Sequence, residues 1–106
     1  MAQVNWTKKA ERVFFARVLH AYNEFGTTTA RRWQEERMRI EHHLEKFPES
    51  YTPESLLSNR KLFYRSCHIM RRFKIVYYYS KTSDIVRIVD IWDTKQHPEN
   101  LKKRIK

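Results

Sequence analysis

The stretch that decides the fold is RFKIVYYYSKTSDIVRIVDIW, from Arg72 to Trp92. Two runs rich in β-branched and aromatic residues, 72–80 and 84–92, flank a short polar segment, which is typical of strands joined in a hairpin. A similar run, KLFYRSCHIM (61–70), comes just before them and predicts one more strand. Two successive hairpins predict an antiparallel sheet.

The two-residue period of a strand assigns its side chains to opposite faces of the sheet. In 72–80, the period separates Phe73, Ile75 and Tyr77 from Lys74, Val76 and Tyr78. In 84–92, it separates Ile85, Val89 and Ile91 from Val86, Ile88, Asp90 and Trp92. One set from each strand is expected to face the core.

Upstream of the strands, apolar residues recur at the spacing of a helix. Thr7 is placed to cap a helix over 8–25, which Gly26 ends, and a second helix runs from 27–29 to about Lys46, before Pro48. A link of one glycine predicts an antiparallel helix hairpin. The stripes predicted to be buried are Ala10, Val13, Phe14, Val18, Leu19, Ala21, Tyr22 and Phe25 in the first helix, and Ala30, Trp33, Ile40, Leu44 and Phe47 in the second.

The remaining segments complete an α+β fold in one predicted domain, residues 1–106. QVNW (3–6) is predicted as a short first strand, and 48–59 as a loop with one helical turn at 53–57. Pro98 starts a short C-terminal helix that Leu101 and Ile105 hold down. Helices first and strands after predict that the helix hairpin packs on one face of a 3–4-stranded antiparallel sheet. The other face is expected to carry the charged and aromatic alternates.

Positive charge is concentrated in the second half of the chain. The net charge is +10, and residues 60–106 hold 13 Lys and Arg against 4 Asp and Glu, whereas residues 1–59 hold 9 against 8. This concentration predicts a polyanionic partner, either nucleic acid or an acidic protein. Cys67 is the one cysteine and is predicted to be a core residue. With no signal peptide and no apolar run near ~18 residues, a cytoplasmic location without membrane contact is expected.

Basic and aromatic residues interleave in the strand region, a composition that suits phosphates and unpaired bases. The alternative for Tyr78 and Trp92 is a place in the core, which is the prediction for Tyr77. Arg65 and Lys74 are alternatively solvated strand residues. The residues predicted to bind nucleic acid are Arg60, Arg71, Arg72, Tyr78 and Trp92.

The segment after the last strand sets an acid, a base and an imidazole close together, at Asp93, Lys95 and His97. RNA cleavage by the 2′-hydroxyl needs an acid, a base and cations, and imidazole titrates at about 6.5. These three residues, with Arg65 and Lys74, have suitable chemistry if the fold brings them together. The alternative is that His97 caps the helix that starts at Pro98.

No metal site or cofactor is predicted. Cys67 and His68 lack metal-ligand spacing, because neighbouring residues of a strand face opposite ways. His20, His42 and His43 lie on the predicted helices and are interpreted as surface or packing residues. The sequence contains neither a Gly-rich phosphate loop nor a nucleophile motif.

Three segments follow one another along the chain: VNWTKKAERVFFARVLHAY (4–22), A..W......I...L...P (30–48) and RRFKIVYYYSKTSDIVRIVDIWDTKQHPENL (71–101). In this order and spacing they resemble the RelE/ParE superfamily, the toxins of bacterial type II toxin–antitoxin modules. The resemblance covers about Val4 to Leu101. It implies two N-terminal helices against an antiparallel sheet, and a cognate antitoxin that wraps the toxin through an extended or helical segment.

The resemblance implies different site residues for different branches. Ribonuclease members, which cut mRNA on the ribosome, use basic residues of the central strands and an Arg plus a Tyr or His near the C-terminus. Here the arginine position falls on Thr94 or Lys95, and the terminal tyrosine has no counterpart except His97. The catalytic residues implied are therefore Lys61, Arg65, Lys74, Lys95 and His97.

Three hypotheses follow from this pattern. The first is a ribosome-dependent mRNA endoribonuclease, which needs no metal and cuts mRNA on the ribosome. The second is a noncatalytic inhibitor of DNA gyrase, because the gyrase-poisoning branch lacks the catalytic set. The third is a basic binding module whose one partner is an acidic antitoxin. Loss of toxicity on changing His97 or Lys74 would favour the first.

Overall fold

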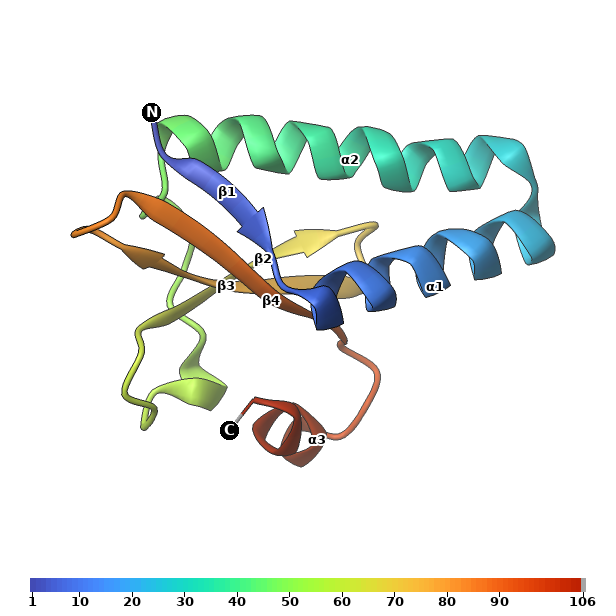
Figure 1. The fold of residues 1–106 in the computed structure, drawn as a ribbon. Coiled ribbons are helices and arrows are strands. Elements are labelled where there is room, and N and C mark those ends of the chain that lie inside the picture. Colours follow the sequence, from blue (N-terminus) through green and yellow to red (C-terminus); the bar gives the residue numbers. More distant parts are fainter. Residues whose placement is uncertain (106) are drawn as a thin grey trace.

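The computed structural model describes residues 1–105, so the last residue of the predicted domain lies outside the described residues. Its elements confirm the predicted α+β class and the order of helices and strands (Figure 1). They are β1 (Gln3–Trp6), α1 (Lys8–Phe25), α2 (Thr27–Lys46), the 3₁₀ turn η1 (Ser55–Leu57), β2 (Tyr64–Ile69), β3 (Phe73–Ser80), β4 (Ile85–Asp93) and α3 (Pro98–Arg104).

The helix hairpin begins and turns where the sequence predicts. The Thr7 hydroxyl accepts a hydrogen bond from the Ala10 N–H at 3.1 Å, which satisfies a backbone donor of the first turn of α1. Gly26 joins α1 to α2 with a φ of 89°, a conformation that glycine adopts at no steric cost. The two helices therefore run side by side over one face of the sheet (Figure 1).

The sheet has the strand order β1-β4-β3-β2. The pairs β2–β3 and β3–β4 are antiparallel, as predicted, but β1 lies parallel to β4, so the sheet is mixed. A parallel pair needs a long crossover, and α1 and α2 provide part of it. β2 begins at Tyr64 instead of 61, which leaves Lys61 in the connection that follows η1.

A β-bulge in β4 changes which side chains face the core. Val76 pairs with Asp90 and Tyr77 pairs with Ile88, so Val89 has no partner on β3. The extra residue shifts the two-residue period, so the predicted division of this strand is right through Val89 and wrong beyond it. The side chains that face the helices are Val86, Ile88 and Ile91, whereas Val89 and Trp92 face α3.

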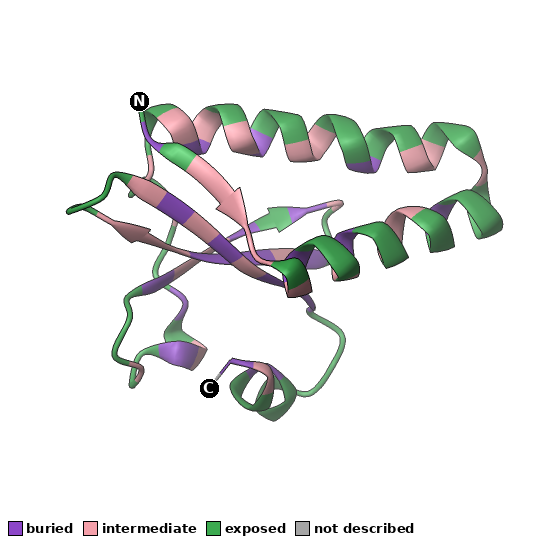
Figure 2. Ribbon diagram, viewed as in Figure 1, coloured by how far each residue is buried: buried purple, intermediate pink, exposed green. Residues whose placement is uncertain are grey.

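Both faces of the sheet are covered (Figure 2). The helix-side core includes Phe14, Trp33, Ile40, Leu44, Ile75 and Tyr77. On the other face, α3 and η1 cover a smaller core of Leu57, Tyr64, Val76, Trp92, Leu101 and Ile105. The second face carries the expected aromatic and charged alternates, such as Trp92 and Lys74, but the short C-terminal helix folds back onto it and buries part of them.

The predicted helix stripes are wider than the buried faces. Leu19, Tyr22 and Phe25 are exposed. They lie in the second half of α1, where the helix hairpin extends past the sheet (Figure 1). Phe47, the C-cap that follows α2, is also exposed, and its ring lies beside the His43 ring with the centroids 5.3 Å apart. No helix within residues 1–105 is long and apolar enough to cross a membrane.

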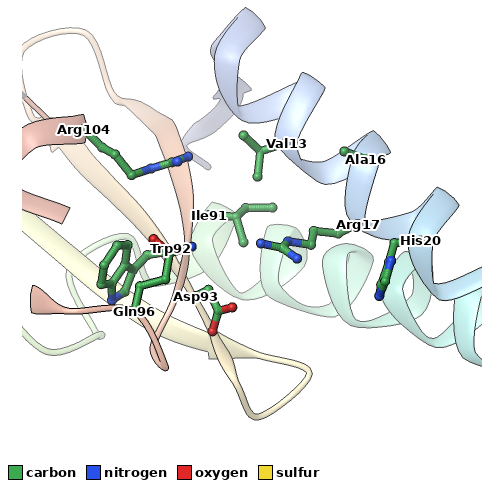
Figure 3. Close-up of a pocket in the computed structure, with 9 residues that line it drawn as sticks. All are labelled: Val13, Ala16, Arg17, His20, Ile91, Trp92, Asp93, Gln96 and Arg104. Carbon is green, nitrogen blue, oxygen red and sulfur yellow. The ribbon is translucent and has the colours of Figure 1, made fainter. Parts of the chain in front are cut away.

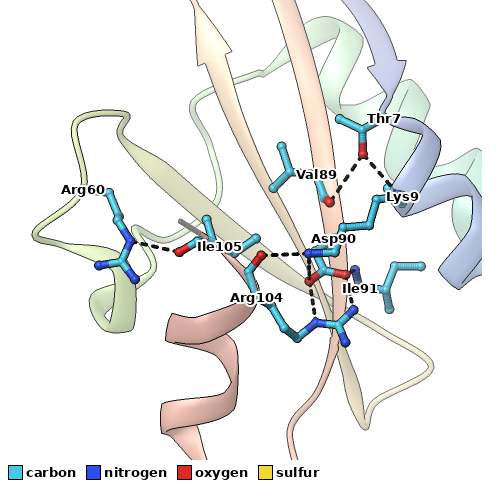
Figure 4. Close-up of polar contacts among 9 residues, drawn as sticks. Thr7, Lys9, Arg60, Val89, Asp90, Ile91, Arg104 and Ile105 are labelled. Carbon is cyan, nitrogen blue, oxygen red and sulfur yellow. Dashed lines mark hydrogen bonds and ion pairs between the residues drawn. The ribbon is translucent and has the colours of Figure 1, made fainter.

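Polar contacts anchor α3 to the rest of the molecule (Figure 4). The Asp90 carboxylate is fully buried and accepts two hydrogen bonds from the Arg104 guanidinium, at 2.6 and 2.7 Å. The Lys9 ammonium lies 3.4 Å from the same carboxylate. Arg60 donates to the carbonyls of Lys102 and Ile105 at the end of the helix. Side chains from α1, β4 and the loop after η1 thus hold α3 in place.

Candidate functional site

The segment after β4 borders a cavity of about 290 Å³ between α1 and the end of the sheet (Figure 3). α1 contributes Arg17 and His20, β4 ends in Asp93, and Gln96 follows in the turn. Figure 3 shows the Arg17 side chain extending from α1 toward the end of β4. Its guanidinium also lies over the Phe73 ring, 4.6 Å from the ring centre, which fixes its position.

Asp93 is a structural carboxylate in this rim. It accepts two hydrogen bonds from Arg72, at 2.7 and 2.9 Å, and one from the Lys95 backbone N–H at 3.0 Å. The hydrogen bonds from Arg72 lower the pKa of Asp93 to about 2, against the opposing effect of burial. A carboxylate held ionised in this way accepts hydrogen bonds but is a weak base near neutral pH.

His97 caps α3, so the alternative stated for this residue is confirmed. Its Nδ1 accepts a hydrogen bond from the Glu99 N–H at 3.1 Å, and Pro98 occupies the first helical position. A neutral imidazole that accepts at Nδ1 carries its proton at Nε2. The His97 and Lys95 side chains are exposed at the rim. Both are accessible to a partner, although Nδ1 is occupied.

Lys74 pairs with a buried acid that the sequence analysis missed. The Glu54 side chain is 2% exposed and lies 3.1 Å from the Lys74 ammonium. Burial opposes ionisation, but hydrogen bonds from the Leu56 N–H, Ser66 and Lys74 leave the pKa of Glu54 lowered. Glu54 is the N-cap of the turn at 55–57, a position that favours a side-chain hydrogen-bond acceptor. This position is the sequence signal that could have identified Glu54.

The predicted catalytic cations lie on opposite faces of the sheet. Arg65 pairs across the strands with Tyr77, which points into the helix-side core, and its guanidinium donates to the Tyr51 carbonyl at 2.8 Å. Lys74 is one residue from Phe73 of that core, so its side chain points to the α3 side. Because the sheet separates them, Arg65 and Lys74 cannot contact one phosphate group in this structure.

The residues predicted to bind nucleic acid are also dispersed. Trp92 is 3% exposed and packs under α3, so the alternative stated for this ring, a place in the core, is confirmed. Arg60 and Arg72 are held by α3 and by Asp93. Arg71 is exposed in the β2–β3 turn, and Tyr78 is half-buried beside Tyr64. Cys67 is a buried core residue, as predicted, and burial raises the pKa of its thiol to about 12.

Solved structures share this arrangement of elements. A structure of the chromosomal ParDE toxin–antitoxin system from Pseudomonas aeruginosa superposes with a TM-score of 0.67 and 17% identity, over 88% of this chain and 96% of that one. The chain has a RelE/ParE-like fold. A metal-bound toxin from Helicobacter pylori matches this fold with a TM-score of 0.65 and 16% identity, over 90% and 97% of the two chains. Neither a protein-family model nor a curated protein sequence matches.

Within the RelE/ParE-like fold, the five predicted catalytic residues do not form one site. Lys95 and His97 lie at the rim after β4, whereas Lys61 lies in the loop that follows η1. Arg65 and Lys74 are divided between the faces of the sheet. Residues 1–105 also contain no group of three or more His, Cys, Asp or Glu side chains that could hold a metal ion.

Proposed function

We propose that this chain is the toxin of a bacterial type II toxin–antitoxin module, acting in the cytoplasm as a noncatalytic inhibitor of DNA gyrase. The RelE/ParE-like fold over about nine-tenths of the chain supports the toxin assignment. A cognate antitoxin is its partner. The charge of residues 60–106 suits acidic segments of such a protein.

The observation that carries the noncatalytic mechanism is the division of the predicted catalytic residues. Cleavage of RNA needs a base, an acid and cations around a single phosphate. Arg65 and Lys74 point to opposite faces, and each lies near an acidic partner, Glu49 at 3.9 Å and Glu54 at 3.1 Å. A toxin that inhibits a target protein by binding to it does not need a base, an acid and cations around one phosphate.

The test is to induce the chain in bacterial cells without an antitoxin, and to add the purified protein to gyrase. We expect growth arrest and loss of DNA supercoiling, with no new mRNA 5′ ends at codon-phased positions. A variant with Lys95→Ala and His97→Asn should inhibit growth as the parent does, because it keeps the helix cap and removes only the rim chemistry. If growth is not arrested, the result would favour the third hypothesis, a basic binding module whose one partner is an acidic antitoxin.

A ribosome-dependent mRNA endoribonuclease is the second candidate, favoured by the exposure of Lys95 and His97 at the rim. The Nε2 atom of His97 is the group available for proton transfer, since Nδ1 accepts from Glu99. Codon-phased cuts in the mRNA of induced cells, lost in the double variant, would establish this activity and overturn the gyrase proposal. The variant thus decides between the two.

A further inference from the structure

A row of side chains crosses the sheet at the end remote from the C-terminal rim. Tyr64 of β2 pairs with Tyr78 of β3, Tyr78 pairs with Arg87 of β4, and Arg87 pairs with Asn5 of β1. Paired residues place their side chains on the same face, about 5 Å apart. Two phenol rings, a guanidinium and an amide therefore lie in one line on the α3 side of the sheet.

This row borders a cavity of about 490 Å³ beside the β3–β4 turn. Leu62 of the preceding loop closes one side, and Tyr78, Arg87 and Lys81 line it together with the hydroxyls of the turn. The volume is in the range of sites for small organic groups, about 300–1,000 Å³. Figure 1 shows the β3–β4 turn projecting beyond the region that α3 covers. Lys81, Thr82 and Ser83 of this turn line the cavity and are exposed, so solvent reaches it.

Arg87 of β4 differs from Arg65 of β2 and from Arg72, the residue before β3. Arg65 and Arg72 each form an ion pair, with Glu49 and Asp93. Among the described residues, 1–105, no carboxylate lies within ion-pair distance of Arg87, although its side chain is half-buried. A guanidinium that is held on a sheet without an acid is available to an anion, and its planar donors suit phosphate.

The neighbouring ring gives this anion site a second recognition element. Tyr78 meets the Tyr64 ring edge to face, with centroids 5.8 Å apart and planes at 87°, which fixes its orientation. A half-buried phenol ring beside a guanidinium without an acidic partner is suited to a stacked base and its phosphate. A duplex keeps its bases stacked on one another, so only an unpaired nucleotide satisfies both groups.

We infer that the row from Tyr64 to Asn5 binds single-stranded nucleic acid, with an unpaired base on Tyr78 and a phosphate at Arg87. The site is separate from the rim at 93–97, since it lies at the opposite ends of β3 and β4. Lys81 in the turn adds positive charge beside it. This binding is independent of the gyrase proposal, because neither the target nor the rim residues take part in it.

The experiment is fluorescence anisotropy with labelled eight-nucleotide RNA and DNA strands of the same mixed sequence, and with the matched duplex. Arg87→Gln and Tyr78→Leu should each raise the Kd for the single strand at least about fivefold. Arg87→Gln should also reduce the slope of log K against log salt by about 0.7. The matched control is Arg31→Gln, an exposed arginine on α2, which should change the Kd less than about twofold.

Thermal unfolding of each variant shows whether it keeps the fold. Binding of the RNA strand, of the DNA strand or of both supports the site. Comparison of the two strands shows whether the site accepts ribose, deoxyribose or both. Equal weakening by Arg31→Gln and Arg87→Gln would overturn the site in favour of general charge attraction. Equal affinity for duplex and single strand, or no effect of Tyr78→Leu, would exclude base stacking. No binding of any oligonucleotide, together with binding of an acidic peptide that Arg87→Gln weakens, would overturn the nucleic-acid site and assign the row to a protein partner instead.

Discussion

The two faces of the sheet are covered in different ways. Helices of 18 and 20 residues cover one face and bury a continuous apolar core. A helix of 7 residues and a turn of 3 cover the other face. A helix as short as α3 is not stable by itself in water. The first face is therefore held by apolar packing, whereas the second depends on a few anchoring contacts.

The anchors of α3 are mostly polar, and they come from distant parts of the chain. Asp90 binds Arg104 and Lys9, and Arg60 binds the backbone at the end of the helix. Only Leu101 and Ile105 provide apolar contacts from α3 itself. We expect the α3 side to open at a lower free energy than the helix side, which is a form of local unfolding.

The largest effect is expected on the helix side. The Trp33 ring packs between Phe14 and Phe73, with centroid distances of 6.2 and 5.1 Å. Trp33→Ala should lower the free energy of unfolding by about 3–5 kcal/mol, because it leaves a large cavity in the core. Urea denaturation measures the change. Met38→Ala, an exposed residue of the same helix, should change it by less than about 0.5 kcal/mol.

A smaller effect is expected on the α3 side from Asp90→Asn. The amide keeps the hydrogen bond from the Ile91 N–H but leaves Arg104 and Lys9 without a counter-charge. Removing one partner of a buried pair costs about 3–5 kcal/mol; because both cations are about one-third exposed, we expect about 2 kcal/mol.

Hydrogen exchange should show faster exchange in α3 of this variant while α1 and α2 stay protected. Glu99→Gln is the matched control, since it removes an exposed ion pair with Lys102 and should cost little. Equal acceleration of exchange in all three helices would contradict the idea that the two faces open separately.

Much of the fold follows from local signals in the sequence. Thr7, Gly26 and Pro98 mark helix boundaries through the chemistry of single residues, and the structure confirms each of them. The helix at 98–104 and its contacts through Leu101 and Ile105 are also predicted correctly. These features depend on neighbours within a few residues, which is the range that hydrophobic period and capping describe.

The errors lie where distant segments meet. The bulge at Val89 shifts the period of β4, and only the pairing with β3 reveals it. The burial of Trp92 follows from α3 folding back onto the sheet. The pairing of Arg72 with Asp93 depends on tertiary contact, so the sequence could not show that this acid is already occupied. The candidate site was therefore less predictable than the fold.

A pH-dependent effect should report on the ion pair at the rim, between Arg72 and Asp93. The pKa of Asp93 is lowered from the ordinary value of 3.8 to about 2. The ionised carboxylate therefore stabilises the folded protein above about pH 4, and this stabilisation is lost as the pH falls toward 2. Arg72→Gln removes the main cause of the low pKa. The unfolding free energy of this variant should depend less on pH between about 4 and 2. An unchanged pH dependence would show that Arg72 does not set this pKa.

The smallest effect should come from the residue that joins the rim to α3. His97→Ala removes the acceptor for the Glu99 N–H and should cost about 0.5–1 kcal/mol, measured by urea denaturation. His97→Asn keeps an acceptor at this position, so its free energy of unfolding should stay within about 0.5 kcal/mol of the parent. If both variants were equally destabilised, the imidazole would contribute packing beyond the cap. Otherwise His97→Asn separates the structural role of His97 at α3 from any chemical role at the rim.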